Sequence, residues 1–306
     1  MHLLTSVNYH LKTLFLFTRS DYKTIFFLAV LIFSFATSPK IQAGSVLRTV
    51  IWIWVHLLQA NVSNQTFSGH EDLINKPWRP LPSGRITPNQ ARALRWCLMI
   101  LCLCVSAVYG PMVLFASAAL TIVEIVHDDV GFSGGTILKN LCNVGGYSTF
   151  ELGAACSLND GRLTETGVIA LICSCLIIFT TISAQDFADV EGDKLSGRRT
   201  LPIVAPDGSR YYILSVLLMW SYILIHMWGV GPRSGGIFVG MGAYIGSRYF
   251  RFREARDDRF SYLLYNASAF NFGINFVSND PLGVATCSSF SSVQCLQWFS
   301  DLVKQA

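Results

Sequence analysis

Charged residues are scarce in this chain of 306 residues, at 14% of the total. A soluble domain usually carries about 25% charged residues, so a globule of this size would lack the charge to cover its surface. The net charge of +4 is small, and the basic residues lie between apolar runs, which argues against a nucleic-acid partner. Nine cysteines are too few for a secreted disulfide scaffold, and 52% hydrophobic residues exclude intrinsic disorder. The remaining class is a polytopic α-helical membrane protein embedded in a lipid bilayer.

What the chain does have is a series of apolar stretches long enough to cross about 30 Å of hydrocarbon. They predict an all-α membrane bundle of eight to nine transmembrane helices. The expected spans are 22–38, 46–62, 93–110, 111–127, 136–156, 164–185, 211–229 and 235–250, with a less apolar ninth at 260–277. The stretch 136–156 is the most polar of the eight, because it holds Lys139 and Glu151. Polar groups at membrane depth face a cavity rather than lipid.

Lysine and arginine are distributed unevenly between the expected loops. If the N-terminus is cytosolic, most of the 23 basic residues fall on the cytosolic side, and the opposite side holds only Lys40, Arg48, Arg162 and Arg233. This bias agrees with the positive-inside rule. We therefore expect 1–21 to be a cytosolic segment, 22–278 the transmembrane domain and 279–306 an atypical C-terminal tail. The expected location is an endomembrane such as the endoplasmic reticulum.

Acidic residues number only 19, yet they gather in two segments of the expected cytosolic side. One segment, residues 185–202, is QDFADVEGDKLSGRRTLP. On a helix that leaves the sixth span, Asp186, Asp189 and Asp193 fall within about 60° of one another. Three carboxylates on one stripe repel unless a cation neutralises them, and Mg²⁺ takes both carboxylate and phosphate oxygens. The basic residues that follow suit phosphate groups. The alternative is a solvated, charged loop.

The second segment, residues 64–85, is NQTFSGHEDLINKPWRPLPSGR. On a helix, Asn64, Ser68, Glu71 and Asp72 lie within roughly 100° of one another. The three prolines that follow break the helix into a rigid basic loop. This segment is a weaker signal by itself, but it lies on the same expected membrane face as the first.

The two segments resemble the two Asp-rich motifs of the UbiA superfamily of intramembrane prenyltransferases. DFADVEGDKLSGRRTLP is similar to the second motif, and NKPWRPLPSGRIT is similar to the sequence that follows the first. The resemblance covers about 22–270. It implies a helical bundle around a central cavity, in which Mg²⁺ ions hold an isoprenoid diphosphate. The first motif departs from the usual N-D-x-x-D-x-x-x-D, because Gln65 and Ser68 replace two of its aspartates. A similar departure is typical of a branch that includes fungal membrane-bound sesquiterpene cyclases.

The resemblance assigns roles to residues of both segments. Catalysis is expected from Asp72, Asp189 and Asp193. The metal ligands are expected to be Asn64, Glu71, Asp72, Asp186, Asp189 and Asp193. The diphosphate is expected to contact Lys76, Arg79, Lys194, Arg198 and Lys139. Aromatic faces steady carbocations, and Trp52, Tyr147 and Phe150 are candidate walls, whereas His56 is interpreted as a packed histidine more readily than as a proton acceptor.

Three functions remain open from the sequence. The first is prenyl transfer from an isoprenoid diphosphate to a small-molecule acceptor. The second is terpene cyclisation of a substrate such as farnesyl diphosphate, which the altered first motif favours. The third is an inactive or non-enzymatic membrane protein, because the chain after Phe270 is unlike the family.

Overall fold

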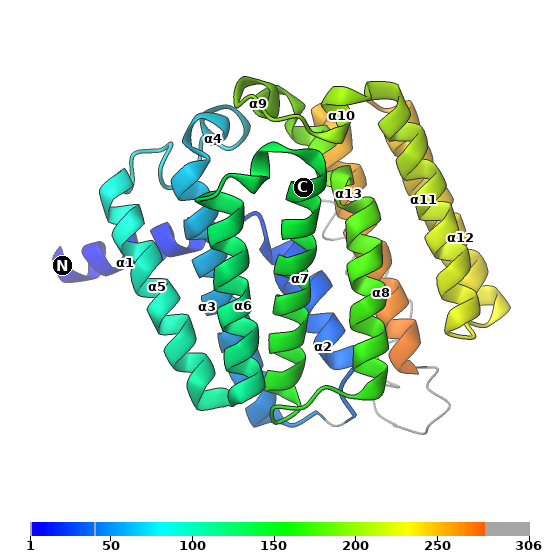
Figure 1. The fold of residues 1–306 in the computed structure, drawn as a ribbon, viewed down its shortest axis with the longest axis horizontal. Helices are drawn as coiled ribbons and strands as arrows, with labels where there is room; N and C mark the ends of the chain where they lie inside the picture. Colours follow the sequence, from blue (N-terminus) through cyan, green and yellow to red (C-terminus); the bar gives the residue numbers. More distant parts are fainter. Residues whose placement is uncertain (1, 40, 279–306) are drawn as a thin grey trace.

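The computed structural model describes residues 2–39 and 41–278, and helices make up most of this part of the chain (Figure 1). The expected tail 279–306 lies outside the described residues. The longer helices are α1 (His2–Thr18), α3 (Ala43–Phe67), α5 (Pro88–Tyr109), α6 (Pro111–Asp128), α7 (Thr136–Leu158), α8 (Glu165–Thr181), α11 (Pro206–Met227), α12 (Pro232–Arg251) and α13 (Ala255–Ser278). The shorter elements are η1 (Tyr22–Leu31), α2 (Ile32–Ala36), α4 (Gly69–Asn75), η2 (Phe132–Gly134), η3 (Ile182–Asp189), α9 (Val190–Leu195) and α10 (Leu201–Val204).

Local sequence explains where several of the long helices begin and end. Thr87 caps α5 in a reciprocal capping box with Gln90, and Pro88 occupies the first turn. The hairpin from α5 to α6 turns at Gly110, whose φ of 129° disfavours other residues, and Pro111 then starts the next helix. Thr164 caps α8 by accepting a hydrogen bond from the backbone N–H of Gly167.

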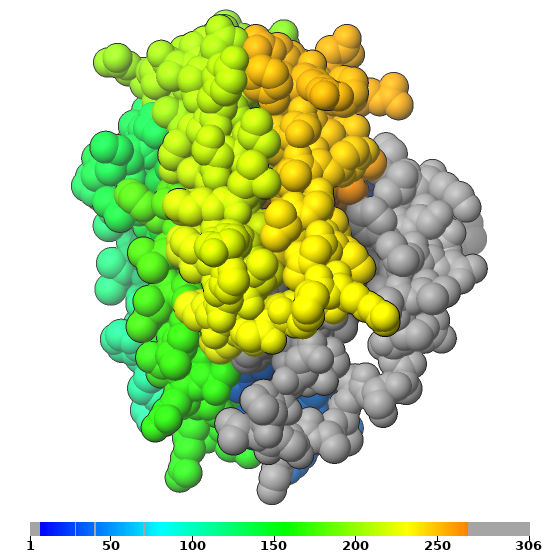
Figure 2. All heavy atoms as spheres, turned by 90° about the vertical axis from the view of Figure 1, so that its right-hand side faces the viewer, coloured from blue at the N-terminus to red at the C-terminus, as the bar shows by residue number. Residues whose placement is uncertain are grey.

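Apolar side chains cover much of the outside of the bundle. Val108, Ile137 and Ile237 are 83%, 67% and 66% exposed. Tyr222 and Tyr244 are exposed on α11 and α12, the two helices that form the yellow-green to yellow face beside α13 in Figure 2. Polar side chains are buried instead, as in bilayer proteins, where only internal partners satisfy polar groups. This distribution of exposed apolar and buried polar side chains is that of an integral, multi-pass membrane protein.

Five helices of the described residues are long and apolar enough to cross a membrane by themselves: α3, α5, α6, the run Glu165–Leu195 and α11. The predicted count of eight to nine spans therefore stays a prediction. The expectation for 136–156 agrees with the structure, because Lys139 and Glu151 on α7 are buried inside the bundle. The N-terminal segment forms α1, which crosses the direction of the bundle helices in Figure 1.

Contrary to the prediction from the sequence, Asp186, Asp189 and Asp193 do not lie on one continuous α-helix. The α-helix ends at Thr181, continues as a tighter 3₁₀ segment to Asp189, and becomes α-helical again only at Val190. A 3₁₀ segment has about 3.0 residues per turn rather than 3.6, so Asp186 and Asp189, three residues apart, still share one face. The segment 64–85 is divided as well, because α3 ends at Phe67 and α4 starts afresh at Gly69.

Candidate active site

The two acidic segments meet where α4 packs against α9 at one edge of the bundle (Figure 1). The close approach depends on Gly192 in α9. A Cβ atom at this position would lie 2.3 Å from Nδ2 of Asn75, well inside contact distance. The absence of a side chain at residue 192 therefore lets the two segments touch.

Two ion pairs join the first acidic segment to the second. Arg198 lies with its Nη1 atom 2.7 Å from Oε2 of Glu71, and the same nitrogen is 3.2 Å from Oδ1 of Asp193. Lys76 lies with its Nζ atom 3.6 Å from Oδ2 of Asp189. The tertiary structure thus brings together the acidic and basic residues that the sequence had assigned to one site.

Asp72 and Arg79 form a buried pair within the segment 64–85. Their Oδ1 and Nη1 atoms are 2.7 Å apart, and the residues are 1% and 5% exposed. Ser68 donates a hydrogen bond of 2.8 Å from its hydroxyl to Oδ2 of Asp72. A hydroxyl at residue 68 therefore supports the last carboxylate of the motif, at a position where the usual family pattern has a carboxylate.

A third element, α7, completes the site. Lys139 is buried on this helix and donates a hydrogen bond of 2.7 Å to Oδ1 of Asp186. The loop after α9 is tied to the same region, because the backbone N–H of Arg199 donates to the carbonyl of Gly134, 3.2 Å away. Residues from α4, η3, α9 and α7 therefore form one charged site at one end of the bundle.

These residues fit a divalent cation. Oδ2 of Asp193 is buried without a hydrogen-bond partner, so the site holds an unused carboxylate oxygen that could bind a cation. Within the described residues, no three His, Cys, Asp or Glu side chains already form a metal cage. Mg²⁺ does not need such a cage, because it keeps several waters and binds one or two carboxylates together with substrate phosphates.

The electrostatics of Glu71 show what a cation would change here. Burial raises the pKa of this carboxyl above its usual range, and the nearby Arg198 opposes that shift. Desolvation of the charged form is therefore the larger effect in the free protein. An additional cation beside Glu71 would favour the ionised carboxylate.

Two of the predicted site residues stand apart from the ion pairs. Lys194 is exposed on α9, and the described contacts place it in no ion pair. Asn64 is partly buried and lines an internal cavity. Their assigned roles stay predictions.

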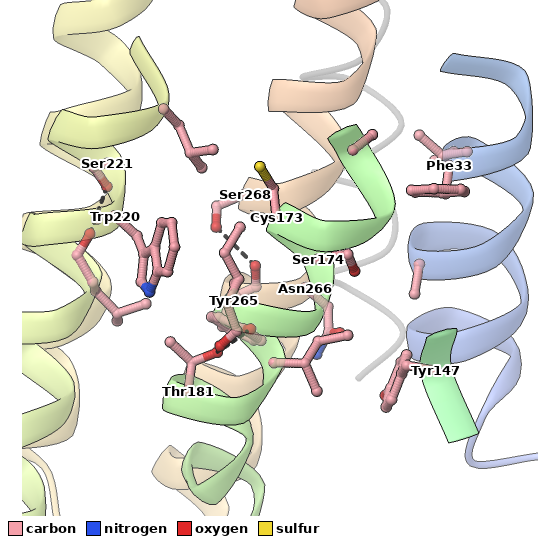
Figure 3. A pocket seen from close by; sticks show the side chains of 18 of the residues that line it. Phe33, Tyr147, Cys173, Ser174, Thr181, Trp220, Ser221, Tyr265, Asn266 and Ser268 are labelled. Carbon is pink, nitrogen blue, oxygen red and sulfur yellow. Dashed lines mark hydrogen bonds between the residues drawn. The ribbon is translucent and has the colours of Figure 1, made fainter. Parts of the chain in front are cut away.

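Two cavities lie inside the bundle. The first, here called the polar cavity, has a volume of about 220 Å³; its lining includes Asn64, Arg79, Glu124, Asp128, Asn143 and Phe150. The second, here called the apolar cavity, has a volume of about 230 Å³; its lining includes Phe33, Glu151, Ile178, Trp220, Leu224 and Tyr265 (Figure 3). Tyr147 lines both.

The expected wall residues divide into two groups. Tyr147 and Phe150 line the polar cavity, as a wall residue should. Trp52 lines neither of these two cavities; it is fully buried and donates a hydrogen bond from its indole N–H to Ser106. His56 stacks on Trp52 and has both ring nitrogens within 2.8 Å of partners, which fits the packed histidine.

The sequence interpretation missed Glu124 on α6 and took Asp128 and Asp129 for a cap or surface turn at the end of that helix. Glu124 accepts a hydrogen bond of 2.9 Å from Gln59, and Asp128 accepts one of 2.6 Å from Ser63. Asp129 pairs with the buried Arg95. Glu124 and Asp128 are four residues apart in an otherwise apolar span, so their spacing on one helix face was an available signal.

The fold and this site define an integral membrane enzyme built as a helical bundle with a charged site at one end. The UbiA prenyltransferase family matches residues 24–271, and the chain belongs to this family.

Its relatives include both a terpene synthase and a prenyl transferase. The chain is 31% identical to the fumagillin β-trans-bergamotene synthase of Aspergillus fumigatus, over 71% of this chain and 75% of that protein. It is 28% identical to a polyprenyl transferase of Hericium erinaceus, over 71% and 75%. The solved structure of a UbiA homologue from Archaeoglobus fulgidus bound to GPP and Mg²⁺ superposes with a TM-score of 0.63, at 12% identity, over 87% of this chain and 99% of that one.

Proposed function

We propose that this chain is a Mg²⁺-dependent enzyme that ionises an allylic isoprenoid diphosphate and cyclises the resulting cation to a terpene. The observation that carries the proposal is the meeting of carboxylates and basic side chains from α4, α7 and α9 beside an internal cavity. A diphosphate needs such cations, and an isoprenoid chain needs such a water-poor interior.

The proposed roles follow the charges. The metal would be held by Asn64, Glu71, Asp72, Asp186, Asp189 and Asp193, directly or through water. The phosphates would be contacted by Lys76, Arg79, Lys139 and Arg198, with Lys194 at the exposed rim. When bound, Mg²⁺ neutralises charge that develops on the departing diphosphate.

The chemistry is the cleavage of one C–O bond. The electron pair leaves with the diphosphate, and an allylic cation remains. Basic residues that now pair with carboxylates can turn to the phosphate oxygens, because charge-assisted hydrogen bonds to either acceptor are comparable. The distal double bond of the same chain then donates its electrons to the cation, which closes a ring. Transfer of a proton from the ring cation to the released diphosphate gives the neutral product.

Two observations favour cyclisation over transfer. The first motif has Ser68 bound to Asp72, where the usual pattern has a carboxylate. The terpene synthase of Aspergillus fumigatus is a relative at 31% identity. Prenyl transfer to an external acceptor, which the sequence alone placed first, becomes the second candidate and is supported by the polyprenyl transferase relative. In either case we propose that the site faces the cytosol from an endomembrane such as the endoplasmic reticulum.

The test is a product assay with the full chain in membranes. Farnesyl diphosphate and Mg²⁺ are supplied without an acceptor, and the volatile extract is analysed. Cyclisation predicts a cyclic hydrocarbon that is lost in Asp189→Asn. Diphosphate release only after an aromatic or lipid acceptor is added would establish transfer instead.

A matched control is available for the aspartate. Asp207 lies outside both acidic segments and forms an exposed pair with Arg253. Asp207→Asn removes the same charge and should leave product formation intact. No turnover by wild-type protein confirmed in the membrane, with or without an acceptor, would contradict both candidates.

A further inference from the structure

Helix α7 separates the polar cavity from the apolar cavity. Asn143, Gly146 and Phe150 line the polar cavity. At about 100° per residue they share one face of the helix, and Glu151, which lines the apolar cavity, points about 80° away from Asn143. Tyr147 falls between these directions, at about 40°, and it lines both cavities.

The first transmembrane segment borders the same two cavities in order. Ile25 on η1 lines the polar cavity. Ala29, about one turn further along, lines the apolar cavity, as does Phe33. The two cavities therefore follow one another along η1 and α2. Figure 3 shows Tyr147 at one end of the apolar cavity, on the side opposite Trp220 and beside α2.

The two cavities differ in what they can hold. The polar cavity reaches the charged site, because Asn64 and Arg79 belong to its lining. The apolar cavity is lined mostly by hydrocarbon and aromatic side chains and, among the described residues, by no lysine or arginine, so it suits additional isoprene units and not a diphosphate. A chain anchored at the charged site would meet the ring of Tyr147 before it reached the apolar cavity.

We infer that Tyr147 sets the length of the isoprenoid chain by closing the apolar cavity to it. This inference rests on the proposed function. The ring acts as a specificity-determining partition and not as an acid or base. Replacing it with a small side chain joins the two cavities and gives room to a longer substrate.

The experiment compares the turnover of geranylgeranyl and farnesyl diphosphate by the full chain in membranes with Mg²⁺. In Tyr147→Ala the ratio of the two rates should rise by at least about tenfold, since a few methylene groups of apolar contact are worth this much. Tyr147→Phe keeps the ring and should keep the wild-type ratio. Tyr147→Leu, which retains apolar bulk if the alanine variant folds poorly, should give an intermediate ratio.

A second variant tests whether the partition matters or only the total volume. Phe33 lines the apolar cavity but not the polar cavity. Phe33→Ala should leave the ratio unchanged when Tyr147 is present, and raise it further only in the Tyr147→Ala background. Such non-additivity is expected only for residues that affect one shared space. An equal shift from Phe33→Ala alone, or an unchanged ratio in active Tyr147→Ala, would overturn the inference.

Binding separates this inference from the proposed function. Thermal unfolding with non-cleavable diphosphate analogues of 15 and 20 carbons reports chain-length preference without turnover. If these analogues stabilise the protein but no substrate is turned over, the proposed function is wrong. The shift in unfolding temperature with the 20-carbon analogue, relative to the 15-carbon analogue, would still show in Tyr147→Ala whether Tyr147 separates the two cavities.

Discussion

At the end of the bundle formed by α4 and α9, the buried carboxylates face lysine or arginine, whereas deeper in the bundle Glu124 and Glu151 are hydrogen-bonded to neutral Gln59 and Ser174. A carboxylate paired with a cation can exchange that partner for a metal, and the released cation can turn to a phosphate. A carboxyl group that is hydrogen-bonded to a neutral amide or hydroxyl has no cationic partner that a metal could replace. Of the two regions compared, the first is the one built to bind an ionic substrate.

The largest effect should come from removing divalent cations. Chelation is expected to abolish diphosphate release, and Mg²⁺ added back should restore it. The unfolding temperature of the ligand-free protein should change little, because lysine and arginine already neutralise the carboxylates. Parallel assays of turnover and thermal unfolding measure both effects. A large loss of stability on chelation would mean that the metal is structural.

The next largest effect should separate the two kinds of carboxylate. Asp72→Asn keeps the shape of the side chain but removes the charge beside Arg79, and we expect turnover to fall by at least about 100-fold. Glu151→Gln makes the same change in the deeper region and should cost less than about threefold, because Ser174 bonds equally to an amide oxygen. Steady-state rates of both variants are measured in membranes. An equal loss of turnover in the two variants would show that the two kinds of carboxylate do not differ in function.

A smaller effect is expected at Arg198, which bridges Glu71 and Asp193. Arg198→Gln should raise KM for the diphosphate by about tenfold, the value of one charge-assisted hydrogen bond. Arg198→Lys keeps the charge without the planar fork and should give an intermediate KM. A fall in kcat with unchanged KM in both variants would assign Arg198 to the transition state alone.

The smallest effect concerns packing. Gly192→Ala places a methyl group against Asn75 and should cost about 1–3 kcal/mol in unfolding free energy. Gly69→Ala, whose Cβ would meet nothing within 4 Å, is the matched control and should be neutral or slightly stabilising. Chemical unfolding in detergent compares the two. Equal stabilities would show that α4 and α9 separate easily.

Much of this protein can be predicted from residue chemistry along the chain. The apolar runs and the Gly110-Pro111 turn predict the membrane bundle and the break between α5 and α6, because hydrocarbon length and backbone geometry are local constraints. The two acidic segments predict the charged site, since clustered carboxylates need cations. The family follows from the same residues.

The change of helix type could not be predicted from the sequence pattern. The single α-helix expected through Asp186, Asp189 and Asp193 is interrupted by a 3₁₀ segment, which still keeps Asp186 and Asp189 on one face. That segment is stabilised by contacts with distant residues, such as the bond of Lys139 to Asp186 across 47 positions of the chain. Propensity alone carries no information about such a partner.

The sequence by itself therefore determined the membrane class, the two charged segments and the chemistry they suit, because these depend on residue type and short-range spacing. Only the tertiary structure decided that Arg198 reaches Glu71, that Gly192 lets Asn75 approach, and that Tyr147 stands between two cavities. Each of these depends on the relative position of helices, which is set by packing among side chains far apart in the chain.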